Sequence, residues 1–268
     1  MKDAFDDPVL LDIADGIAIV TLNRPRSMNA LSEDMLCHLQ DTWDTLAANR
    51  DVKAVVLRGA GDHFCAGHNL KEMTAHRQDA DGGSQYFNDL FATCSKMMMS
   101  IVHLPQPVIA QVQGIATAAG CQLVATCDLA VAAEDARFAT SGVNIGLFCS
   151  TPMVALSRNV ARKKAMEMLL LGDFLPATDA VDTGLINRVV PRDAVSDAAL
   201  GMARRIAEKA PAAIKIGKEA FYAQAAMNLE DAYAHTGAAM AENMMARDTR
   251  NGIDAFISKK PMPEWSGD

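Results

Sequence analysis

Apolar residues gather in five short runs, which are separated by longer stretches with a helical pattern. The runs are continuous and rich in Val, Ile, Leu and Ala, as is typical of strands that are covered on both faces. They are IAIVTL at 17–22, AVVL at 54–57, VIAQV at 108–112, LAVAA at 129–133 and LINRVV at 185–190. Buried strands that alternate with helices predict an α/β fold.

Three helices are predicted between these strands. The first is capped by Ser32 and places apolar residues at helical spacing on one face: Met35, Leu36, Leu39, Trp43 and Leu46. The second spans residues 84–104 and is stopped by the two prolines that follow. The third runs over about 162–171 and is closed by Gly172.

After Pro191 the strand pattern disappears. Apolar positions at 195, 199, 202, 206 and 210 form one helical stripe, Pro211 opens another helix, and helical patterns continue to about Arg247. We therefore predict an α/β core over residues 1–192 and a helical region over residues 193–268.

The composition narrows the classes of function. The chain has 25 basic and 33 acidic residues among 268, and its net charge of -8 is dispersed, so binding to nucleic acid or to an anionic membrane surface is not expected. The start, MKDAFDDPVL, lacks the basic and then apolar residues of a secretory signal. The apolar segment 114–127 falls short of the roughly 20 residues that span a bilayer. A cytoplasmic protein is expected.

The sequence gives no strong indication of a metal site. The six cysteines form no CxxC pair and no zinc-spaced cluster with histidine, so reduced structural thiols are expected. His63 and His68 stand five residues apart in one loop, but no third ligand is visible. Walker A, Rossmann, HExxH and GxSxG signatures are also absent from the sequence.

Two glycine-containing loops follow buried strands and are the candidates for chemistry. They are GDHFCAGHNLKEM at 61–73 and GIATAAGCQL at 114–123, and each runs into a helical pattern. Backbone N–H groups at helix starts have no partner within the helix. Two such groups directed at one point would stabilise a negatively charged oxygen. Spacing alone favours the alternative, that these are ordinary tight turns packed under a sheet.

Five segments, in the same order along the chain, resemble the enoyl-CoA hydratase/isomerase family, the crotonase superfamily. They are LNRPRSMNALS at 22–32, FCAGHNLKEM at 64–73, PVIAQVQGIATAAGCQLVATCDLAVAAEDARF at 107–138, AMEMLLLGDFLPATDAVDTGLINRVVP at 165–191 and AFISKKP at 255–261. The resemblance implies a crotonase-like α/β spiral of ββα units with two packed sheets and a C-terminal helical trimerisation region. It also implies a coenzyme A thioester as substrate or ligand, no metal, and a homotrimer or hexamer.

The resemblance also assigns residues to the site. The oxyanion donors fall on the backbone N–H groups of His68 and Ala119, and Ala119 stands where a glycine is usual, so that a positive φ there would be unfavourable. The residues expected to bind coenzyme A are Arg26, Ala66, His68, Asn69, Leu70 and Lys259. Of these, Arg26 and Lys259 would meet the phosphates, Lys259 from a neighbouring subunit or from the tail.

At two positions the sequence departs from the family pattern. Hydratases of this family use two glutamates around one water, and the resemblance places Gln122 at the first position and Gly142 at the second. Neither residue can transfer a proton as a carboxylate does. General acid or base assistance is worth roughly 100 to 10,000-fold per group, so the standard hydratase mechanism is not expected. Isomerisation relies on the second carboxylate as well.

Several functions therefore stay open. One is an acyl-CoA enzyme with a retained oxyanion hole, including a hydrolase or a decarboxylase. Another is a noncatalytic acyl-CoA-binding protein or an oligomeric partner. The His68 side chain is the best placed replacement proton carrier, unless its ring faces solvent or makes a structural hydrogen bond. Other candidates in nearby segments are Glu72, Asn144, Cys149 and Ser150.

Overall fold

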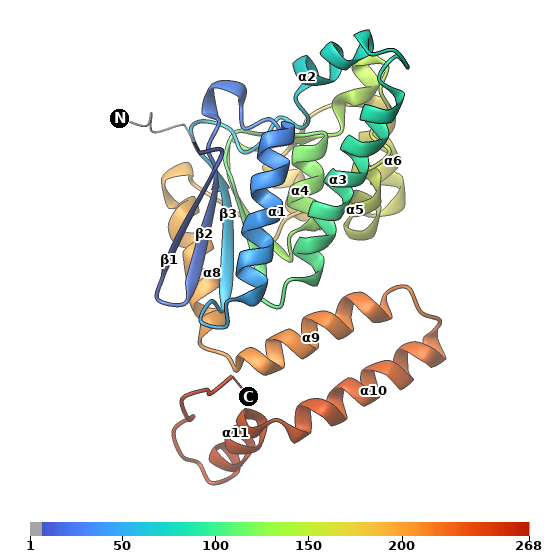
Figure 1. Ribbon diagram of the computed structural model, residues 1–268. Helices are drawn as coiled ribbons and strands as arrows, with labels where there is room; N and C mark the ends of the chain where they lie inside the picture. Colours follow the sequence, from blue (N-terminus) through green and yellow to red (C-terminus); the bar gives the residue numbers. More distant parts are fainter. Residues whose placement is uncertain (1–6, 268) are drawn as a thin grey trace.

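A computed structural model describes residues 7–267, and its larger sheet forms the centre of the molecule (Figure 1). Its six strands are ordered β1-β2-β3-β4-β6-β9. They are β1 (Val9–Ala14), β2 (Ile17–Leu22), β3 (Ala54–Gly59), β4 (Val108–Val112), β6 (Leu129–Ala133) and β9 (Arg188–Val190). Only the β1–β2 pair is antiparallel, and the other neighbours run parallel, as continuous apolar runs predict.

The runs at 17–22, 54–57, 108–112 and 129–133 are confirmed as strands, but the run at 185–190 is shorter than predicted. The N–H groups of Leu185 and Ile186 both donate to the Ala180 carbonyl, at 3.0 and 3.3 Å. These two apolar residues therefore belong to the turn that ends a helix, and the strand begins only at Arg188.

A smaller sheet, ordered β5-β7-β8, was not predicted. Its strands are β5 (Ile115–Thr117), β7 (Arg137–Ala139) and β8 (Leu175–Pro176). Strands of two or three residues are too short to show an alternation of apolar and polar positions. Its first strand, β5, follows β4 along the chain and belongs to the second glycine-containing loop.

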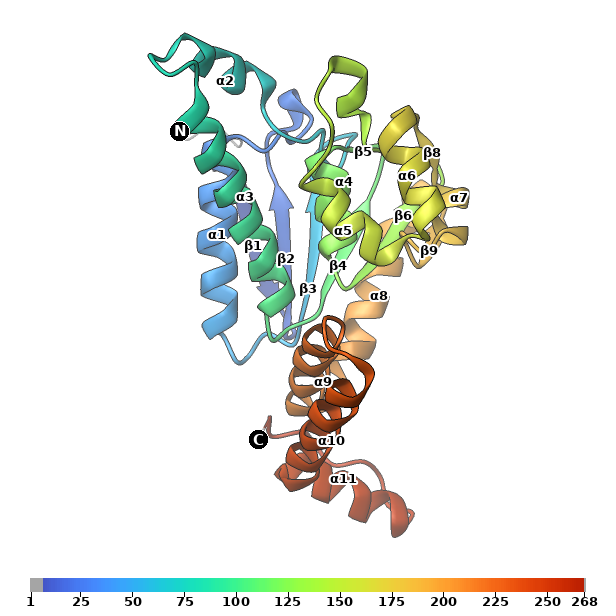
Figure 2. The same ribbon diagram turned by 90° about the vertical axis from the view of Figure 1, so that its right-hand side faces the viewer.

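Helices cover both faces of the larger sheet (Figure 2). On one face lie α1 (Glu33–Ala48) and α3 (Ser84–His103). The Ser32 side chain accepts a hydrogen bond from the Met35 N–H at 3.1 Å, and the five predicted apolar residues of α1 are buried. On the other face, α8 (Val195–Ala207) packs Ala199 and Ala203 against the strands.

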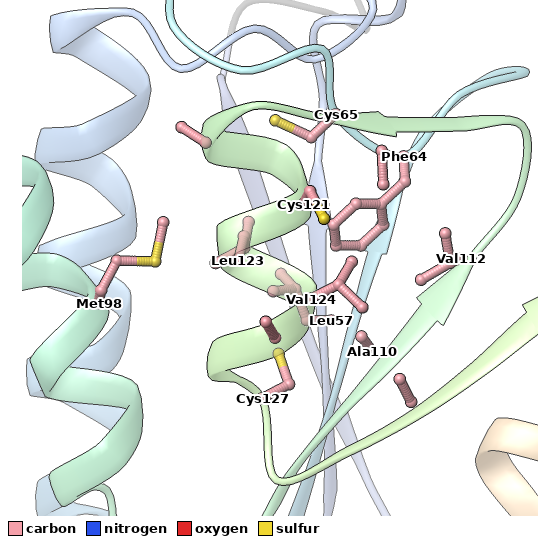
Figure 3. Close-up of a cluster of buried hydrophobic side chains, with 14 of the residues drawn as sticks. Leu57, Phe64, Cys65, Met98, Ala110, Val112, Cys121, Leu123, Val124 and Cys127 are labelled. Atoms are coloured by element: carbon pink, nitrogen blue, oxygen red, sulfur yellow. The ribbon is translucent and has the colours of Figure 1, made fainter. Parts of the chain in front are cut away.

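The central helix α4 (Ala119–Thr126) is buried along its whole length. Figure 3 shows its Cys121 and Val124 directed toward Phe64 and Leu57, with the Met98 side chain approaching from another helix. This packing holds the start of α4, which belongs to the second glycine-containing loop, in a fixed place between the sheet and α3.

Four shorter helices complete the core. They are α2 (Leu70–Ala75), α5 (Pro152–Asn159), α6 (Arg162–Leu171) and α7 (Ala177–Asp182). The predicted helix at 162–171 is confirmed and ends at Gly172 in the left-handed conformation, whereas α5 and α7 were not predicted. None of the helices within residues 7–267 is long and apolar enough to cross a membrane.

Three helices extend away from the core beyond α8: α9 (Pro211–Gln224), α10 (Leu229–Met245) and α11 (Arg247–Ile257) (Figures 1 and 2). Together with α8 they make up the helical region that was predicted after Pro191. The two-sheet α/β core followed by a helical C-terminal region confirms the predicted crotonase-like fold class.

One buried ion pair attaches α9 to the core. The Lys218 ammonium donates to the Asp128 carboxylate at 2.7 Å and to the carbonyls of Ile101 and Gln106 at 2.9 and 3.1 Å. Tyr222 donates to the same carboxylate at 2.9 Å. All three Lys218 donors are therefore satisfied, and the ion pair joins α9 to the ends of α3 and α4.

Candidate functional site

The first glycine-containing loop is held in an extended form between two other segments. On one side, the Leu31 N–H donates to the Gly67 carbonyl at 2.7 Å and the Asn69 N–H donates to the Leu31 carbonyl at 3.2 Å. On the other side, the Cys65 carbonyl accepts from the Thr117 N–H at 3.0 Å. The loop is thus a rigid part of the structure, fixed by backbone hydrogen bonds on both edges.

The two glycine-containing loops touch at Gly67 and Gly120. Gly67 has a φ of +89°, and a Cβ there would lie 3.0 Å from the Ala118 Cβ and 3.2 Å from the Ala119 nitrogen. A Cβ on Gly120 would lie 2.1 Å from the Cys65 carbonyl oxygen. Only residues without a side chain allow this close approach. The glycines therefore bring the residue after Gly67 next to the first residue of α4.

The N–H groups of His68 and Ala119 flank this contact. Within residues 7–267, neither N–H donates to an acceptor of the protein. Ala119 is the first residue of α4, where an unpaired N–H is expected. The structure thus brings the two predicted oxyanion donors to the same place and leaves both available to an acceptor.

The strained backbone lies at Ala118 rather than at Ala119. Ala118 has φ 51° and ψ -118°, a region that residues with a side chain rarely adopt, whereas Ala119 begins a regular helix. Ala119 therefore has no positive φ, and the methyl group at this position adds no backbone strain. The Ala118 N–H donates to the Ala139 carbonyl at 2.9 Å, which helps to hold the strained conformation. Strain of about 1–3 kcal/mol at one residue is typical of functional sites.

The His68 ring is enclosed next to this contact. Its two nitrogens are buried, and neither has a hydrogen-bond partner among the described residues. The ring meets Phe91 of α3 edge-on, with 5.6 Å between centroids. Burial lowers the pKa of His68, and the Leu31 backbone opposes this shift more weakly. The imidazole is therefore neutral near pH 7, and its two nitrogens do not face solvent.

Gln122, which the resemblance places at the first glutamate position, is a buried amide. Gln122 is 6% exposed and lies one turn into α4, where its backbone N–H donates to the Ala118 carbonyl at 3.0 Å. Its Oε1 has no partner within residues 7–267. The side chain can bind a donor there, but it cannot exchange a proton as a glutamate would.

The second position has no space for any side chain. Gly142 is buried in the 3₁₀ turn Ser141–Ile145. A Cβ there would lie 2.2 Å from the Leu147 carbonyl oxygen and 2.9 Å from the Cys149 sulfur. The segment after Gly142 has folded into the volume that a carboxylate side chain would need.

The other candidate proton carriers are engaged elsewhere or poorly suited. Glu72 accepts two hydrogen bonds at the start of α2, and Asn144 donates to the Gly172 carbonyl at 3.2 Å. Burial raises the pKa of the Cys149 thiol, and the Gly142 backbone opposes this only in part. Ser150 is exposed. Cys149 therefore stays protonated near pH 7, and its thiol is a poor base.

Most residues expected to bind coenzyme A lie at the edge of the first loop. The Ala66 N–H donates to the Met28 carbonyl at 3.0 Å, which sets the loop beside the turn Pro25–Ser27 that carries Arg26. Leu70 is 50% exposed. The Asn69 side chain caps α2, accepting from the Lys71 N–H at 3.1 Å. Its amide therefore has a structural role in addition to any contact with a ligand.

Lys259 lies apart from these residues. It follows α11, which Figure 1 shows at the opposite end of the molecule from α2. Within one chain it therefore does not reach the first loop, and a contact with ligand requires a neighbouring subunit, as the sequence analysis allowed.

Two residues of this region were not identified from the sequence. Ala118 carries the strain, and Thr140 is fully buried with an Oγ1 that has no partner among the described residues. The run of small residues before Gly120 gave a weak signal for Ala118, but nothing in the sequence distinguishes Thr140. No group of three or more His, Cys, Asp or Glu side chains within residues 7–267 is arranged to hold a metal ion.

Comparisons with known proteins agree with this architecture. The family profile described as enoyl-CoA hydratase/isomerase matches residues 12–268. Enoyl-CoA hydratase domain-containing protein 3, mitochondrial, from Rattus norvegicus is 44% identical over 94% of this chain and 82% of its own length. The Homo sapiens protein of that name is 45% identical over 94% of this chain and 81% of its own length.

Solved structures are similarly close. The crystal structure of an enoyl-CoA hydratase from Mycobacterium smegmatis has a TM-score of 0.91 and 52% identity, and covers 96% of this chain and 98% of its own. The crystal structure of human enoyl Coenzyme A hydratase domain-containing protein 3 has a TM-score of 0.90 and 43% identity. It covers 96% of this chain and 99% of its own.

The expectation of a cytoplasmic location is contradicted by these relatives. The rat, human and Xenopus laevis proteins are all named as mitochondrial, which points to mitochondria rather than to the cytoplasm. The expectation rested on the acidic start of the chain, whereas a compartment is specified by address segments that receptors read and not by the folded core.

The order of the strands, the contact between the two glycine-containing loops and the match over residues 12–268 lead to one conclusion: the chain belongs to the enoyl-CoA hydratase/isomerase family of the crotonase superfamily.

Proposed function

We propose that this chain binds acyl-coenzyme A thioesters and polarises the thioester carbonyl between the N–H groups of His68 and Ala119. The observation that carries the proposal is the contact at Gly67, which sets two unpaired N–H groups beside each other. One such donor is worth about 100 to 1,000-fold in rate when an oxygen becomes negatively charged. Arg26, on the adjacent turn, is the cation proposed to meet the coenzyme A phosphates.

The chemistry that fits this site is one that needs no carboxylate base. Gln122 and Gly142 replace the two acids, so water cannot be activated in the way that hydration requires. Loss of carbon dioxide from a 2-carboxyacyl thioester leaves its electron pair in an enolate, which two N–H donors stabilise directly. Decarboxylation therefore fits these residues better than hydrolysis, for which a water must be deprotonated. Binding without turnover is the remaining alternative.

Infrared spectroscopy tests the carbonyl contact without requiring turnover. Butyryl-CoA labelled with ¹³C at the carbonyl is added to the full-length protein, and the isotope-shifted carbonyl band is followed. We expect the band to move to lower frequency on binding, because two hydrogen bonds weaken the C=O bond. A bound ligand with an unshifted band would contradict the proposal.

Two glycine variants provide a matched comparison. Gly67→Ala places a methyl group 3.2 Å from the Ala119 nitrogen, at a φ of +89°. Gly82→Ala has similar backbone strain at φ +69°, but nothing lies within 4 Å of the new Cβ. We expect the band shift to disappear in the first variant and to persist in the second. Loss of the shift in both variants would show that backbone strain, not blockage, is responsible, and persistence in both would contradict the proposed contact.

The mechanistic part is tested with crotonyl-CoA. Without both acids, hydration is expected to be at least about 100-fold slower than in a hydratase that has two glutamates, measured under the same conditions. Hydration at a comparable rate would show that another group activates the water. Parallel assays with a 2-carboxyacyl-CoA follow the release of carbon dioxide and separate decarboxylation from binding alone.

We also propose that the helical region associates with copies of itself to give the expected homotrimer or hexamer. The helix α10 has no buried residue, and large apolar side chains on α10 and α11 are mostly exposed. Examples are Leu229 at 74%, Tyr233 at 73% and Phe256 at 74% exposed. Patches of this kind mark protein interfaces.

A further inference from the structure

A cavity of about 540 Å³ lies between the core and the helical region. Its walls come from the end of α1 and the loop before β3, from the loop before β4, and from the end of α8 and the start of α9. Figure 1 shows these segments at the end of the molecule opposite to α2, which follows the first glycine-containing loop. Small-molecule sites have volumes of about 300–1,000 Å³. The cavity is therefore large enough for a ligand and is separate from the proposed thioester site.

Gln106, in the loop before β4, brings an unpaired acceptor to this cavity. The residue is 5% exposed, and its Nε2 donates to the carbonyls of Leu46 and Asn49, both at 2.9 Å. Its Oε1 has no partner within residues 7–267. Buried polar atoms without a partner are rare in native proteins. A ligand that carries an N–H or O–H donor would pair this oxygen.

The start of α9 has the opposite character, because it attracts anions. Pro211 and Ala212 are the first two residues of this helix and line the cavity, and no side chain caps the helix. N–H groups at a helix start have no partner within the helix and bind phosphate or carboxylate groups. Lys209 and Lys215, on either side of this start in the sequence, line the cavity as well. An anionic group is therefore favoured here.

The last described residues add a further wall, which is held in place by hydrogen bonds. Ser266 and Gly267 line the cavity. The Asp248 carboxylate accepts from their two N–H groups at 2.9 and 2.8 Å. The Trp265 Nε1 donates to the Glu208 carbonyl at 2.8 Å, which ties the tail to the end of α8. This wall is thus formed before any ligand binds.

Cations outnumber acids around the cavity, although the chain as a whole has 25 basic and 33 acidic residues. The charged residues of its walls are Arg50, Lys53, Lys209 and Lys215 against Asp51, Glu219 and Glu242. Of the four cations, only Lys215 has an ion-pair partner within residues 7–267, Glu219 at 3.9 Å. This local excess of unpaired positive charge also favours an anionic ligand.

From these observations we infer that the cavity binds a nucleoside monophosphate. The phosphate meets the start of α9 and the nearby lysines, and an amino group of the base donates to the unpaired oxygen of Gln106. Val52, Pro105 and Ile206 line the cavity and offer apolar surface to the flat base. Inorganic phosphate lacks the base, and a nucleoside lacks the charge, so only the combination uses all three features. The inference is independent of the proposed function.

Calorimetric titration of the full-length protein at pH 7.5 tests this with AMP, adenosine and inorganic phosphate, each with and without saturating butyryl-CoA. We expect AMP to bind with a Kd below about 1 mM. Adenosine and phosphate should each bind at least about tenfold more weakly, because each keeps only part of the contacts. Butyryl-CoA should leave the Kd of AMP unchanged, since the two sites lie at opposite ends of the molecule.

Two neighbouring alanines at the end of α1 provide a matched pair of variants. Both are exposed, but of the two only Ala47 lines the cavity. Ala47→Trp should weaken AMP binding at least about tenfold, because the ring occupies the cavity, whereas Ala48→Trp should leave it unchanged. Lys209→Glu should weaken it at least about threefold. Its control is Lys96→Glu, which changes an exposed lysine on α3.

The outcomes decide the inference and keep it apart from the proposed function. Absence of AMP binding up to about 10 mM, or equal affinity for AMP and either of its parts, would overturn it. Displacement of AMP by butyryl-CoA would place AMP at the thioester site and overturn it as well. The same holds for equal losses in Ala47→Trp and Ala48→Trp. Failure of butyryl-CoA to bind would contradict only the proposed function.

Discussion

At the scale of single residues, Ala118 holds the most unusual backbone of the site. Its φ of 51° and ψ of -118° suit glycine, and a methyl group there is unfavourable. We expect Ala118→Gly to stabilise the protein by about 1 kcal/mol, since the relief of strain exceeds the added entropy of the unfolded chain. Urea unfolding measures this.

A second alanine tests the sign of that prediction. Ala161 precedes α6 with an ordinary φ of -53° and ψ of 136°. Ala161→Gly should destabilise the protein by several tenths of a kcal/mol, because only the entropy term changes. If both glycine variants are destabilised, the Ala118 backbone is not strained.

The His68 ring makes stability depend on pH. Burial lowers the pKa of His68 below its ordinary 6.5, so between these two pKa values the unfolded chain binds a proton that the folded chain does not. The contribution of His68 to the free energy of unfolding is therefore fully present above about pH 6.5, and it falls as the pH decreases below that value. His68→Gln should lose less of its Tm than the natural protein when the pH changes from 7.5 to 5.5. An identical loss would mean that the buried ring does not contribute.

The sequence predicted the residues of the site better than their conformations. The family pattern pointed to His68 and Ala119, whose N–H groups lie beside the contact between the two loops without an acceptor in residues 7–267, because it depends on residue identity and spacing. It did not identify the positive φ of Ala118, since nothing in the sequence shows which of Ala118 and Ala119 precedes the helix. Thr140 went unnoticed because its burial follows from packing between distant segments.

At the scale of elements, the attachment of α9 depends on one side chain. The Lys218 side chain is 6% exposed and that of Asp128 is 15% exposed. Removal of one partner from such a pair leaves the other charge buried, which destabilises a protein by about 3–5 kcal/mol. We expect Lys218→Met to have an effect of this size on the free energy of unfolding in urea.

A neighbouring lysine serves as the control for that experiment. Lys215 lies one turn earlier on α9, is 55% exposed, and meets Glu219 at 3.9 Å. Exposed pairs contribute about 0–1 kcal/mol, so Lys215→Met should change stability little. Similar losses in the two variants would indicate that α9 tolerates no change of charge, rather than that Lys218 is special.

Elements were predictable where the pattern was long. Four strands of the larger sheet, β2, β3, β4 and β6, and the helix α1 follow from apolar runs and a capped amphipathic stretch, which are local properties. The strands of the smaller sheet were missed because each has only two or three residues, and tertiary pairing alone makes them strands. β1 was missed as well, although it pairs along its whole length with β2. Asp12 interrupts its apolar residues, so no continuous apolar run marks it.

At the scale of the whole molecule, the core of the same chain leaves large apolar side chains of the helical region uncovered. Tyr233 is 73% exposed on α10 and Phe256 is 74% exposed on α11. We expect the natural protein to elute as an oligomer in size-exclusion chromatography with light scattering. The double variant Tyr233→Glu with Phe256→Glu should shift it toward the monomer, since charge is unfavourable in an apolar interface.

A charge placed elsewhere provides the comparison. Leu10 is 42% exposed on β1, far from α10 in the chain. Leu10→Glu should leave the measured mass unchanged. A natural protein that is monomeric at all concentrations tested would rule out association through the helical region.

The packing around Gly142 also restricts how this chain can change over evolutionary time. A glutamate at this position alone would meet the Leu147 carbonyl at 2.2 Å, so the backbone of the following segment must move before the acid can be accepted. Gln122→Glu needs no such movement, but one acid does not restore a pair. Two-acid chemistry in this chain therefore requires several coordinated substitutions, because the shape of this segment as well as the residue identity opposes it.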